Sequence, residues 1–198
     1  MARDLEGNDS TLHGSVALGL ISVVEALLHY GADLDARNNS DFTPLMVASF
    51  YGRPDCALAL LNAGADAAST RAAIGQTALY IAMARGHTSM LKVLLQGTVT
   101  KDLPSRDGVT PLMLAASLGH LDGARALISA GANLEAQEMT DGASPLHIAC
   151  TVGNAAMTKL LLLDDADVNP TAKLGTTPLM MAVKYGNADC RSRLGGCR

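Results

Sequence analysis

The fold is decided by residues 43–52, which read TPLMVASFYG. A threonine hydroxyl can accept a hydrogen bond from a backbone N–H left unpaired at the start of a helix, so Thr43 is a typical N-cap. Pro44 stands at the first helical position, where the missing N–H of proline costs nothing. Gly52 closes the stretch, and glycine readily takes the left-handed conformation that ends many helices. Residues 43–52 therefore predict one short helix with both ends marked.

The same pattern recurs along the whole chain. Six copies of a tetrapeptide with Thr or Ser first and Leu third begin, at steps of 33 or 34 residues, at Ser10, Thr43, Thr77, Thr110, Ser144 and Thr177. A second landmark keeps the same phase and consists of Gly19, Gly52, Gly86, Gly119, Gly153 and Gly186. Two independent markers in phase across six units indicate an internal repeat, and a repeat of this length determines the whole fold.

A second, longer helix is expected after each landmark glycine. The predicted second helices cover residues 21–30, 55–63, 88–96, 121–130 and 155–163. Apolar residues such as Val24, Leu27 and Leu28 recur in them at helical spacing and mark a buried face. Glycines at positions 31, 64 and 131 end three of these helices, and polar, Gly-rich stretches follow. Such stretches predict projecting turns that return the chain to the next Thr-Pro.

These features resemble the ankyrin repeat family over residues 8 to 190. The matching stretches include TPLMVAS at 43–49, LLHYGAD at 27–33 and SPLHIAC at 144–150. The resemblance implies an all-α solenoid of stacked helix-turn-helix units with projecting β-turn fingers, in a single domain over residues 1–198. Its repeats would cover approximately residues 8–40, 41–74, 75–107, 108–141, 142–174 and 175–198. A tetratricopeptide array has a similar period, but the Thr-Pro caps and Gly-Ala-Asp turns argue against it.

Two parts of the chain depart from the repeat. The residue expected to be the helix-ending glycine is Thr98 in the third repeat and Asp165 in the fifth. Asp tolerates a left-handed backbone better than a β-branched Thr does, so the third joint is expected to be irregular. In the sixth repeat Ser192 and Gly195 replace leucines, which leaves Leu194 as the main anchor of the second helix. The sixth repeat is either a polar terminal cap, which solenoids need for solubility, or the end of a shortened product.

The composition excludes several classes of protein. Apolar residues make up 48% of the chain and aromatic residues only 3%, which suits thin layers of Ala, Leu, Met and Gly better than a core filled with rings. The net charge is −4 and the basic residues are scattered, so no nucleic-acid partner is expected. The first ten residues are charged and lack an apolar core, so no signal peptide is expected, and no apolar run is long enough to span a membrane. We expect a monomer in the cytoplasm, with the nucleus as a further location.

Catalytic chemistry is not expected. His147 and Cys150 stand three residues apart on a helix and could form a nucleophile pair or half a metal site. In the ankyrin resemblance, however, His147 and His13 occupy the position where an imidazole ties repeats together by hydrogen bonds. The four cysteines have neither CxxC nor zinc-site spacing, so we expect no metal and no cofactor. Asn169 resembles asparagines that are hydroxylated in this family, although Pro170 departs from that pattern.

The resemblance implies that the chain binds another protein through a concave face. That face would consist of the finger tips, the residue before each capping Thr, and the two residues before each landmark glycine. In this sequence the positions are Asn39, Ser40, Phe42, Phe50, Tyr51, Ile74, Gln76, Arg85, Arg106, Asp107, Val109, Leu118, Thr140, Asp141, Val152, Lys173, Leu174, Lys184 and Tyr185. Phe50 and Tyr51 could instead pack between neighbouring helices.

The chain is predicted to be a non-catalytic interaction module, an adaptor or a scaffold. Both phenylalanines of the chain fall on the predicted surface, and aromatic and arginine side chains are the most frequent hot spots of protein interfaces. A fold of this kind does not name its partner. An inhibitor that occludes an enzyme or a transcription factor is the alternative, and an enzyme is a less favoured one.

Overall fold

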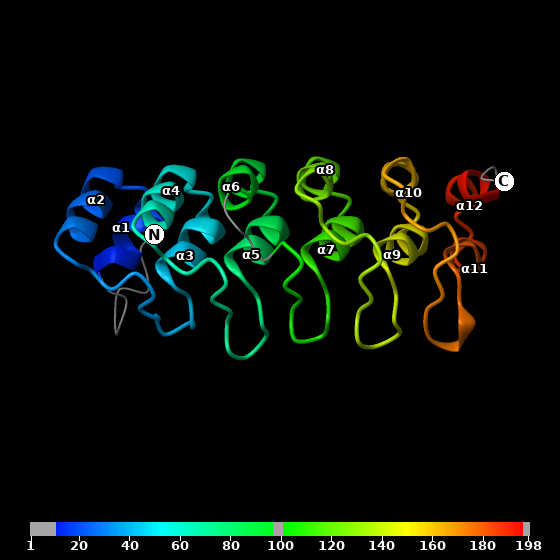
Figure 1. The fold of residues 1–198 in the computed structure, drawn as a ribbon, viewed down its shortest axis with the longest axis horizontal. Coiled ribbons are helices and arrows are strands. Elements are labelled where there is room, and N and C mark those ends of the chain that lie inside the picture. The colour runs from blue at the N-terminus through cyan, green and yellow to red at the C-terminus, as the bar shows by residue number, and fades with distance from the viewer. Residues whose placement is uncertain (1–10, 97–100, 196–198) are drawn as a thin grey trace. The chain divides into compact units, whose positions relative to one another are not determined.

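The computed structural model describes residues 11–96 and 101–195 as pairs of short helices joined by projecting turns (Figure 1). The first helices of the pairs are α1 (Thr11–Leu18), α3 (Pro44–Tyr51), α5 (Ala78–Arg85), α7 (Pro111–Leu118), α9 (Pro145–Val152) and α11 (Pro178–Lys184). The second helices are α2 (Ile21–His29), α4 (Pro54–Asn62), α6 (Thr88–Leu94), α8 (Leu121–Ser129), α10 (Ala155–Leu163) and α12 (Ala188–Gly195). A short 3-10 turn covers Lys173–Gly175. The helices belong to two compact units, Met1–Thr100 and Lys101–Arg198, called unit 1 and unit 2 below.

The first helices begin and end as the sequence predicts. Four threonine caps accept a hydrogen bond from the backbone N–H three residues later, at 3.2 to 3.4 Å: Thr43, Thr77, Thr110 and Thr177. Ser144 differs, because its hydroxyl pairs with Nδ1 of His147 at 2.9 Å. All six landmark glycines have φ between 64° and 76°, in the left-handed region. The four threonine caps and the six glycine stops are therefore confirmed, whereas the Ser144 hydroxyl pairs with a side chain instead of a backbone N–H. The cap predicted at Ser10 lies outside the described residues.

The spacing between the starts of successive repeats alternates between 33 and 34 residues because the turns differ in length. Three turns are closed by an amide-to-carbonyl hydrogen bond across four residues: Asn38 to Phe42, Ser105 to Val109 and Ala172 to Thr176. Two turns are closed across five residues: Arg71 to Gln76 and Glu138 to Ala143. These longer turns lead into the repeats that begin at Thr77 and Ser144, which are the two repeats reached by a 34-residue step. One extra residue in a turn therefore accounts for each longer step.

Neighbouring first helices pack closely within each unit. In unit 1, α3 lies against both α1 and α5, and in unit 2, α9 lies against both α7 and α11. In α3, α5, α7, α9 and α11 one equivalent position holds an alanine that is at most 1% exposed: Ala48, Ala82, Ala115, Ala149 and Ala182. A side chain this small lets the adjacent helices approach, and removing these apolar surfaces from water stabilises the stack.

The second helices begin and end within two residues of their predicted limits. The glycines at 31, 64 and 131 have positive φ, and Asp165 takes the same conformation with φ of 64°, as predicted. The expectation for Thr98 lies outside the described residues. Within residues 11–96 and 101–195, no helix has the length and apolar character needed to cross a membrane.

The sixth repeat keeps its second helix but exposes apolar surface on its first. Leu194 is 5% exposed and packs in the core, so the prediction that it anchors α12 is confirmed. On α11, by contrast, Met180 is 55% exposed and Val183 is 57% exposed. The residues equivalent to Met180 in the second and fourth repeats, Met46 and Met113, are fully buried. On α11, apolar side chains are therefore exposed, one of them at a position that is buried in the second and fourth repeats.

Candidate functional site

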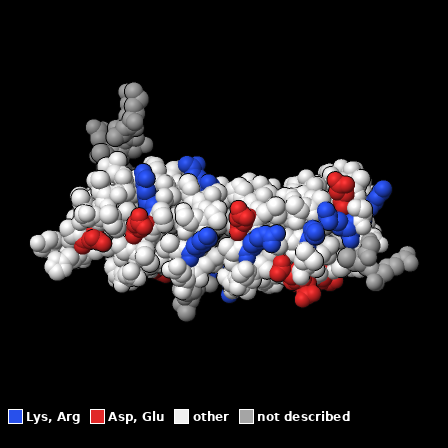
Figure 2. All heavy atoms as spheres, turned by 90° about the horizontal axis from the view of Figure 1, so that it is seen from above, with Lys and Arg blue, Asp and Glu red and all other residues white. Residues whose placement is uncertain are grey.

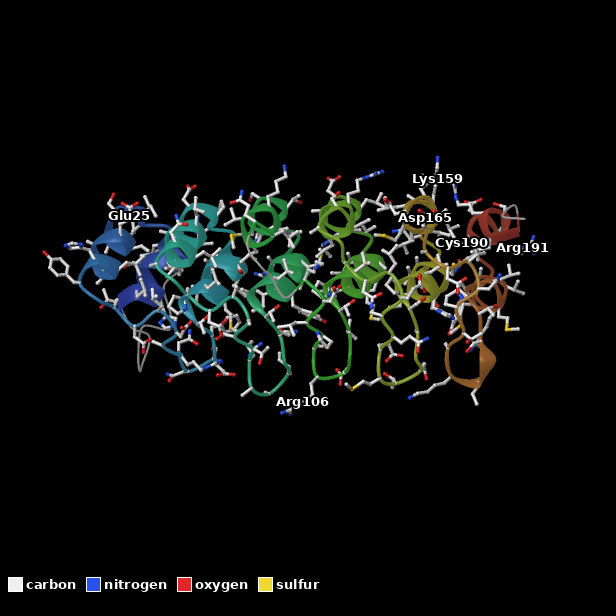
Figure 3. The ribbon with its side chains drawn as sticks, in the orientation of Figure 1. Glu25, Arg106, Lys159, Asp165, Cys190 and Arg191 are labelled. Atoms are coloured by element: carbon white, nitrogen blue, oxygen red, sulfur yellow. The ribbon has the colours of Figure 1, made fainter. Side chains whose placement is uncertain are left out.

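The residues predicted to bind a partner are all exposed or half-buried, and they fall into two sets because the chain forms two units. In unit 1 the structure brings Phe42, Phe50, Tyr51 and Arg85 into one group. In unit 2 the predicted residues lie along the turns and the first helices; Arg106, for example, projects from a turn (Figure 3).

The group in unit 1 is held together by ring contacts. The Phe42 and Phe50 ring centroids lie 5.8 Å apart at 81°, and those of Phe50 and Tyr51 lie 5.1 Å apart at 71°. Such edge-to-face pairs are favourable arrangements of aromatic rings. The guanidinium carbon of Arg71 lies 4.5 Å from the Phe42 centroid, and that of Arg85 lies 4.0 Å from the Phe50 centroid. These five residues are called the aromatic–arginine cluster below.

Two histidines fix the backbone of the cluster. Nε2 of His13 hydrogen-bonds to the carbonyl of Phe42 at 2.9 Å, and Nε2 of His87 hydrogen-bonds to the carbonyl of Phe50 at 3.2 Å. Each histidine comes from a neighbouring repeat in unit 1, so its hydrogen bond also ties two repeats together. The structural role predicted for His13 is confirmed. The two phenylalanines are therefore presented on a backbone that is held from both sides.

Beside the cluster is an open pocket of about 160 Å³, lined by Asn38, Ser40, Phe42, Val47, Phe50 and Tyr51. Sequence reasoning did not select Asn38, Val47 or Arg71. Arg71 belongs to the next turn, and its Nη2 donates to the carbonyl of Ser40 at 3.2 Å. Only the stacking of one turn on the next brings Arg71 to Phe42, so the spacing of motifs could not reveal it.

The carboxylate of Asp41 lies near the cluster and is already paired with an arginine outside the cluster. Asp41 and Arg37 form an ion pair at 2.8 Å. A hydrogen bond from the amide of Ala72 is the main reason that the pKa of Asp41 lies below its ordinary value, and Arg37 lowers it further. Asp41 therefore stays ionised and fastens two consecutive turns to each other.

In unit 2 several predicted residues hold turns together. Glu138 accepts hydrogen bonds from the amides of Thr140 and Asp141, each at 2.6 Å, and from the Thr140 hydroxyl. Partial burial raises the pKa of Glu138, but these hydrogen bonds outweigh it and lower the pKa to about 2. Lys173 donates to the carbonyls of Met139 and Thr140 at 2.6 and 2.7 Å. Thr140, Asp141 and Lys173 thus serve the turns themselves, whereas Leu118, Val152, Leu174 and Tyr185 expose apolar surface.

The histidine and cysteine of α9 do not form a reactive pair. His147 is fully buried; Nδ1 bonds to Ser144, and Nε2 bonds to the carbonyl of Thr176 at 3.0 Å. The predicted role of His147 in tying repeats is therefore confirmed. Cys150 lies near the hydroxyl of Thr158 instead, and burial raises its thiol pKa to about 12, which disfavours the nucleophilic thiolate. Across the described residues, no group of three or more His, Cys, Asp or Glu side chains could hold a metal ion.

A model of ankyrin repeats matches the chain in three copies, over residues 2–71, 67–138 and 134–195. The chain belongs to the ankyrin repeat family. The resemblance seen in the sequence is therefore confirmed, and so is the fold class, an all-α ankyrin-repeat solenoid.

Known ankyrin repeat proteins resemble this chain over most of its length. The nuclear factor NF-kappa-B p105 subunit of Gallus gallus is 31% identical over 179 residues, which are 88% of this chain and 18% of that protein. The B-cell lymphoma 3 protein homolog of Mus musculus is 31% identical over 189 residues, 91% of this chain and 42% of that protein. This chain thus spans less than half of either relative.

Among solved structures, the ankyrin repeat domain of Bcl-3, described as a unique member of the IkappaB protein family, matches with a TM-score of 0.91. The sequence identity is 29%, and the match covers 96% of this chain and 86% of the Bcl-3 chain. This ankyrin repeat chain is thus similar to an IkappaB-family domain in both sequence and fold.

Proposed function

We propose that this ankyrin repeat chain is a non-catalytic protein-interaction module, an adaptor or scaffold that binds a partner protein through its turns and first helices. The aromatic–arginine cluster of unit 1 is the observation that carries the proposal. Tyr51 is 52% exposed and Arg85 is exposed, while Phe42 and Phe50 are half-buried beside an open pocket. Aromatic and arginine side chains supply a large share of the binding energy at protein interfaces.

Within each unit, the surface made by the second helices differs from the surface made by the turns and first helices. Charged side chains of both signs are scattered over it (Figure 2), and Glu25 and Lys159 project outward from α2 and α10 (Figure 3). Protein interfaces are depleted of charged residues at their centre, so this face suits solvent better than a partner. An inhibitor that occludes an enzyme or a transcription factor would use the same turn-side surface and would differ in lowering the activity of its partner.

Matched substitutions on the two faces test the proposal. A partner is first captured by crosslinking the full chain in lysate and identified by mass spectrometry. Its affinity is then measured for Arg85→Ala against Lys92→Ala in unit 1, and for Arg106→Ala against Lys159→Ala in unit 2. Losing a central anchor costs about 2 kcal/mol, which is roughly thirtyfold in affinity. We expect such a loss from at least one turn-side variant and little change from either second-helix control.

Each variant must melt like the parent chain before its affinity is compared. If Lys92→Ala and Lys159→Ala weaken binding more than the matched variants Arg85→Ala and Arg106→Ala do, the chain binds through its second helices and the proposed surface is wrong. Assaying the partner's activity with and without the chain then separates an adaptor from an inhibitor.

A further inference from the structure

We propose that the aromatic–arginine cluster is a subsite for a partner segment that carries a large apolar side chain next to a carboxylate. The proposal rests on the proposed function and adds the chemistry of the partner at one place in unit 1. Three features of the cluster support it: its rings are not needed by the fold, its pocket has the size of one apolar side chain, and its arginines have unused hydrogen-bond donors.

The repeat itself shows that the fold does not need these rings. The residues at the position of Phe42 in the four following repeats are Gln76, Val109, Ala143 and Thr176. The residues at the position of Phe50 are Ala84, Ser117, Thr151 and Lys184. The same backbone therefore forms with small or polar side chains at both places. The chain has only six Phe and Tyr residues, and three of them gather here without a structural requirement.

The pocket has the dimensions of a single apolar group. Its volume of about 160 Å³ is close to that of a protein cavity of roughly 150 Å³ that accommodates a benzene molecule. Phe42, Val47, Phe50 and Tyr51 provide apolar walls, and Asn38 and Ser40 provide a polar rim. A leucine, isoleucine, methionine or phenylalanine side chain would fill this space and remove the exposed ring faces from water. The polar rim suits the backbone of the segment that carries it.

The arginines set the charge of the neighbouring group. Arg85 makes no hydrogen bond or ion pair within the described part of the chain, and its contact is the face of the Phe50 ring. A guanidinium that stacks on a ring keeps the N–H donors along its edge, and these donors match the two oxygens of a carboxylate. The Nε of Arg71 is buried without a hydrogen-bond partner. Asp41 is paired with Arg37 and also interacts electrostatically with Arg71. Arg85 is therefore the cation of the cluster that no carboxylate within the described residues engages. The cluster is thus a local basic site on a chain whose net charge is −4.

A carboxylate fits this site better than a phosphate group. Arg85 is the last residue of α5, where the helix dipole places partial negative charge. That partial charge opposes a doubly charged anion more than a singly charged one. Phosphate sites also usually offer several backbone N–H donors at a helix N-terminus, whereas the walls of this pocket are mainly rings. We therefore assign Asp or Glu as the charged residue of the partner segment.

Selection from a displayed library of random dodecapeptides on the full chain tests the assignment. The matched variant is Phe42→Gln with Phe50→Ala, because the third repeat carries these residues at the same positions and folds with them. We expect enriched peptides to place a large apolar residue within a few positions of Asp or Glu. The double variant should weaken their binding by about tenfold or more, the amount typical of a lost apolar anchor.

The charge is tested by a double-mutant cycle. Arg85→Gln should weaken an acid-bearing peptide by about fivefold or more and should leave the same peptide with Asp→Asn unaffected. Lys92→Gln, which removes an exposed charge from α6, should change neither. Enriched peptides without an acid, or equal effects of Arg85→Gln and Lys92→Gln, would overturn the proposal. So would a phosphoserine peptide that binds far more tightly than its Asp counterpart.

The selection distinguishes this proposal from the proposed function. Peptides that bind the chain and its double variant equally well would refute the subsite and leave the interaction function intact. A selection that enriches nothing would also count against the subsite, because a preformed pocket for a short segment should capture one. If the captured partner binds the second-helix face, the binding surface given under the proposed function is instead wrong.

Discussion

The substitution His147→Met isolates one hydrogen bond between repeats in unit 2. Met46 and Met113 occupy the equivalent position, are fully buried, and accept the backbone N–H of Thr43 and Thr110 through sulfur at 3.5 and 3.4 Å. Methionine at 147 should therefore fill the space of the imidazole and still serve the start of α9. The Ser144 hydroxyl, which now pairs with Nδ1 of His147, can then accept from the backbone N–H at 147, as Thr43 and Thr110 do from Met46 and Met113. The contact that methionine does not replace is the hydrogen bond from the imidazole to the next repeat.

The expected cost is about 1 kcal/mol, the net value of one neutral hydrogen bond. It is not larger because the carbonyl of Thr176, which loses the 3.0 Å bond to His147, still accepts the amide of Ala172 at 2.9 Å. No buried acceptor is left unpaired. His147→Ala should cost more, about 3 kcal/mol, because it also leaves a cavity and removes the acceptor of the Ser144 backbone N–H, which a methionine sulfur would keep.

Urea unfolding followed by circular dichroism gives the change in stability, and amide hydrogen exchange shows where it falls. The loss should be concentrated in α9 and α11, because each repeat of a solenoid contacts only its neighbours. A methionine variant as stable as the parent chain would show that the hydrogen bond to Thr176 contributes nothing. If the methionine and alanine variants lose equal stability, position 147 is not equivalent to Met46 and Met113.

Three further outcomes are expected. Gly52→Ala should lower the melting temperature more than Gly186→Ala. Both substitutions strain a left-handed residue, but a Cβ at Gly52 would lie 2.9 Å from the His87 ring, whereas no described atom lies within 4 Å of a Cβ at Gly186. Equal melting temperatures would contradict this. Glu138→Gln should cost about 1 kcal/mol at pH 7 after allowance for solvent screening. Because the pKa of Glu138 is lowered from 4.5 to about 2, the difference in unfolding free energy should persist above pH 4.5 and disappear as the pH falls toward 2; a constant difference would refute the cause. Chelator and reductant should leave the melting temperature unchanged, and a drop of several degrees reversed by zinc would reveal a metal site.

The parts of the fold that sequence predicted well depend on contacts within about ten residues. A threonine that caps a helix reaches the N–H three residues later, and a left-handed glycine ends the helix it follows. Such interactions are local, so the spacing of Thr43, Pro44 and Gly52 was enough to identify them. Asp165 could be predicted for the same reason, since its conformation depends on its own side chain.

The candidate surface was predicted less completely. Phe42, Phe50 and Arg85 were found because they occupy family positions, but Arg71 was not, since it reaches Phe42 only through the stacking of two turns. Lys173 was chosen as a partner contact, and the structure shows it hydrogen-bonded to the preceding turn. A side chain in a turn can point into solvent or toward the neighbouring turn. The residues that decide between the two lie about 33 positions away in the sequence.

The sequence by itself determined the number of repeats, their caps and stops, and the family. Local hydrogen bonds and a fixed period set these features, and both can be read along the chain. Only the tertiary structure decided which turn residues meet, where the pocket beside Phe50 forms, and why the period alternates between 33 and 34. Those features depend on how one repeat packs on the next. The sequence of a repeat indicates that packing only through the spacing of its small and apolar residues.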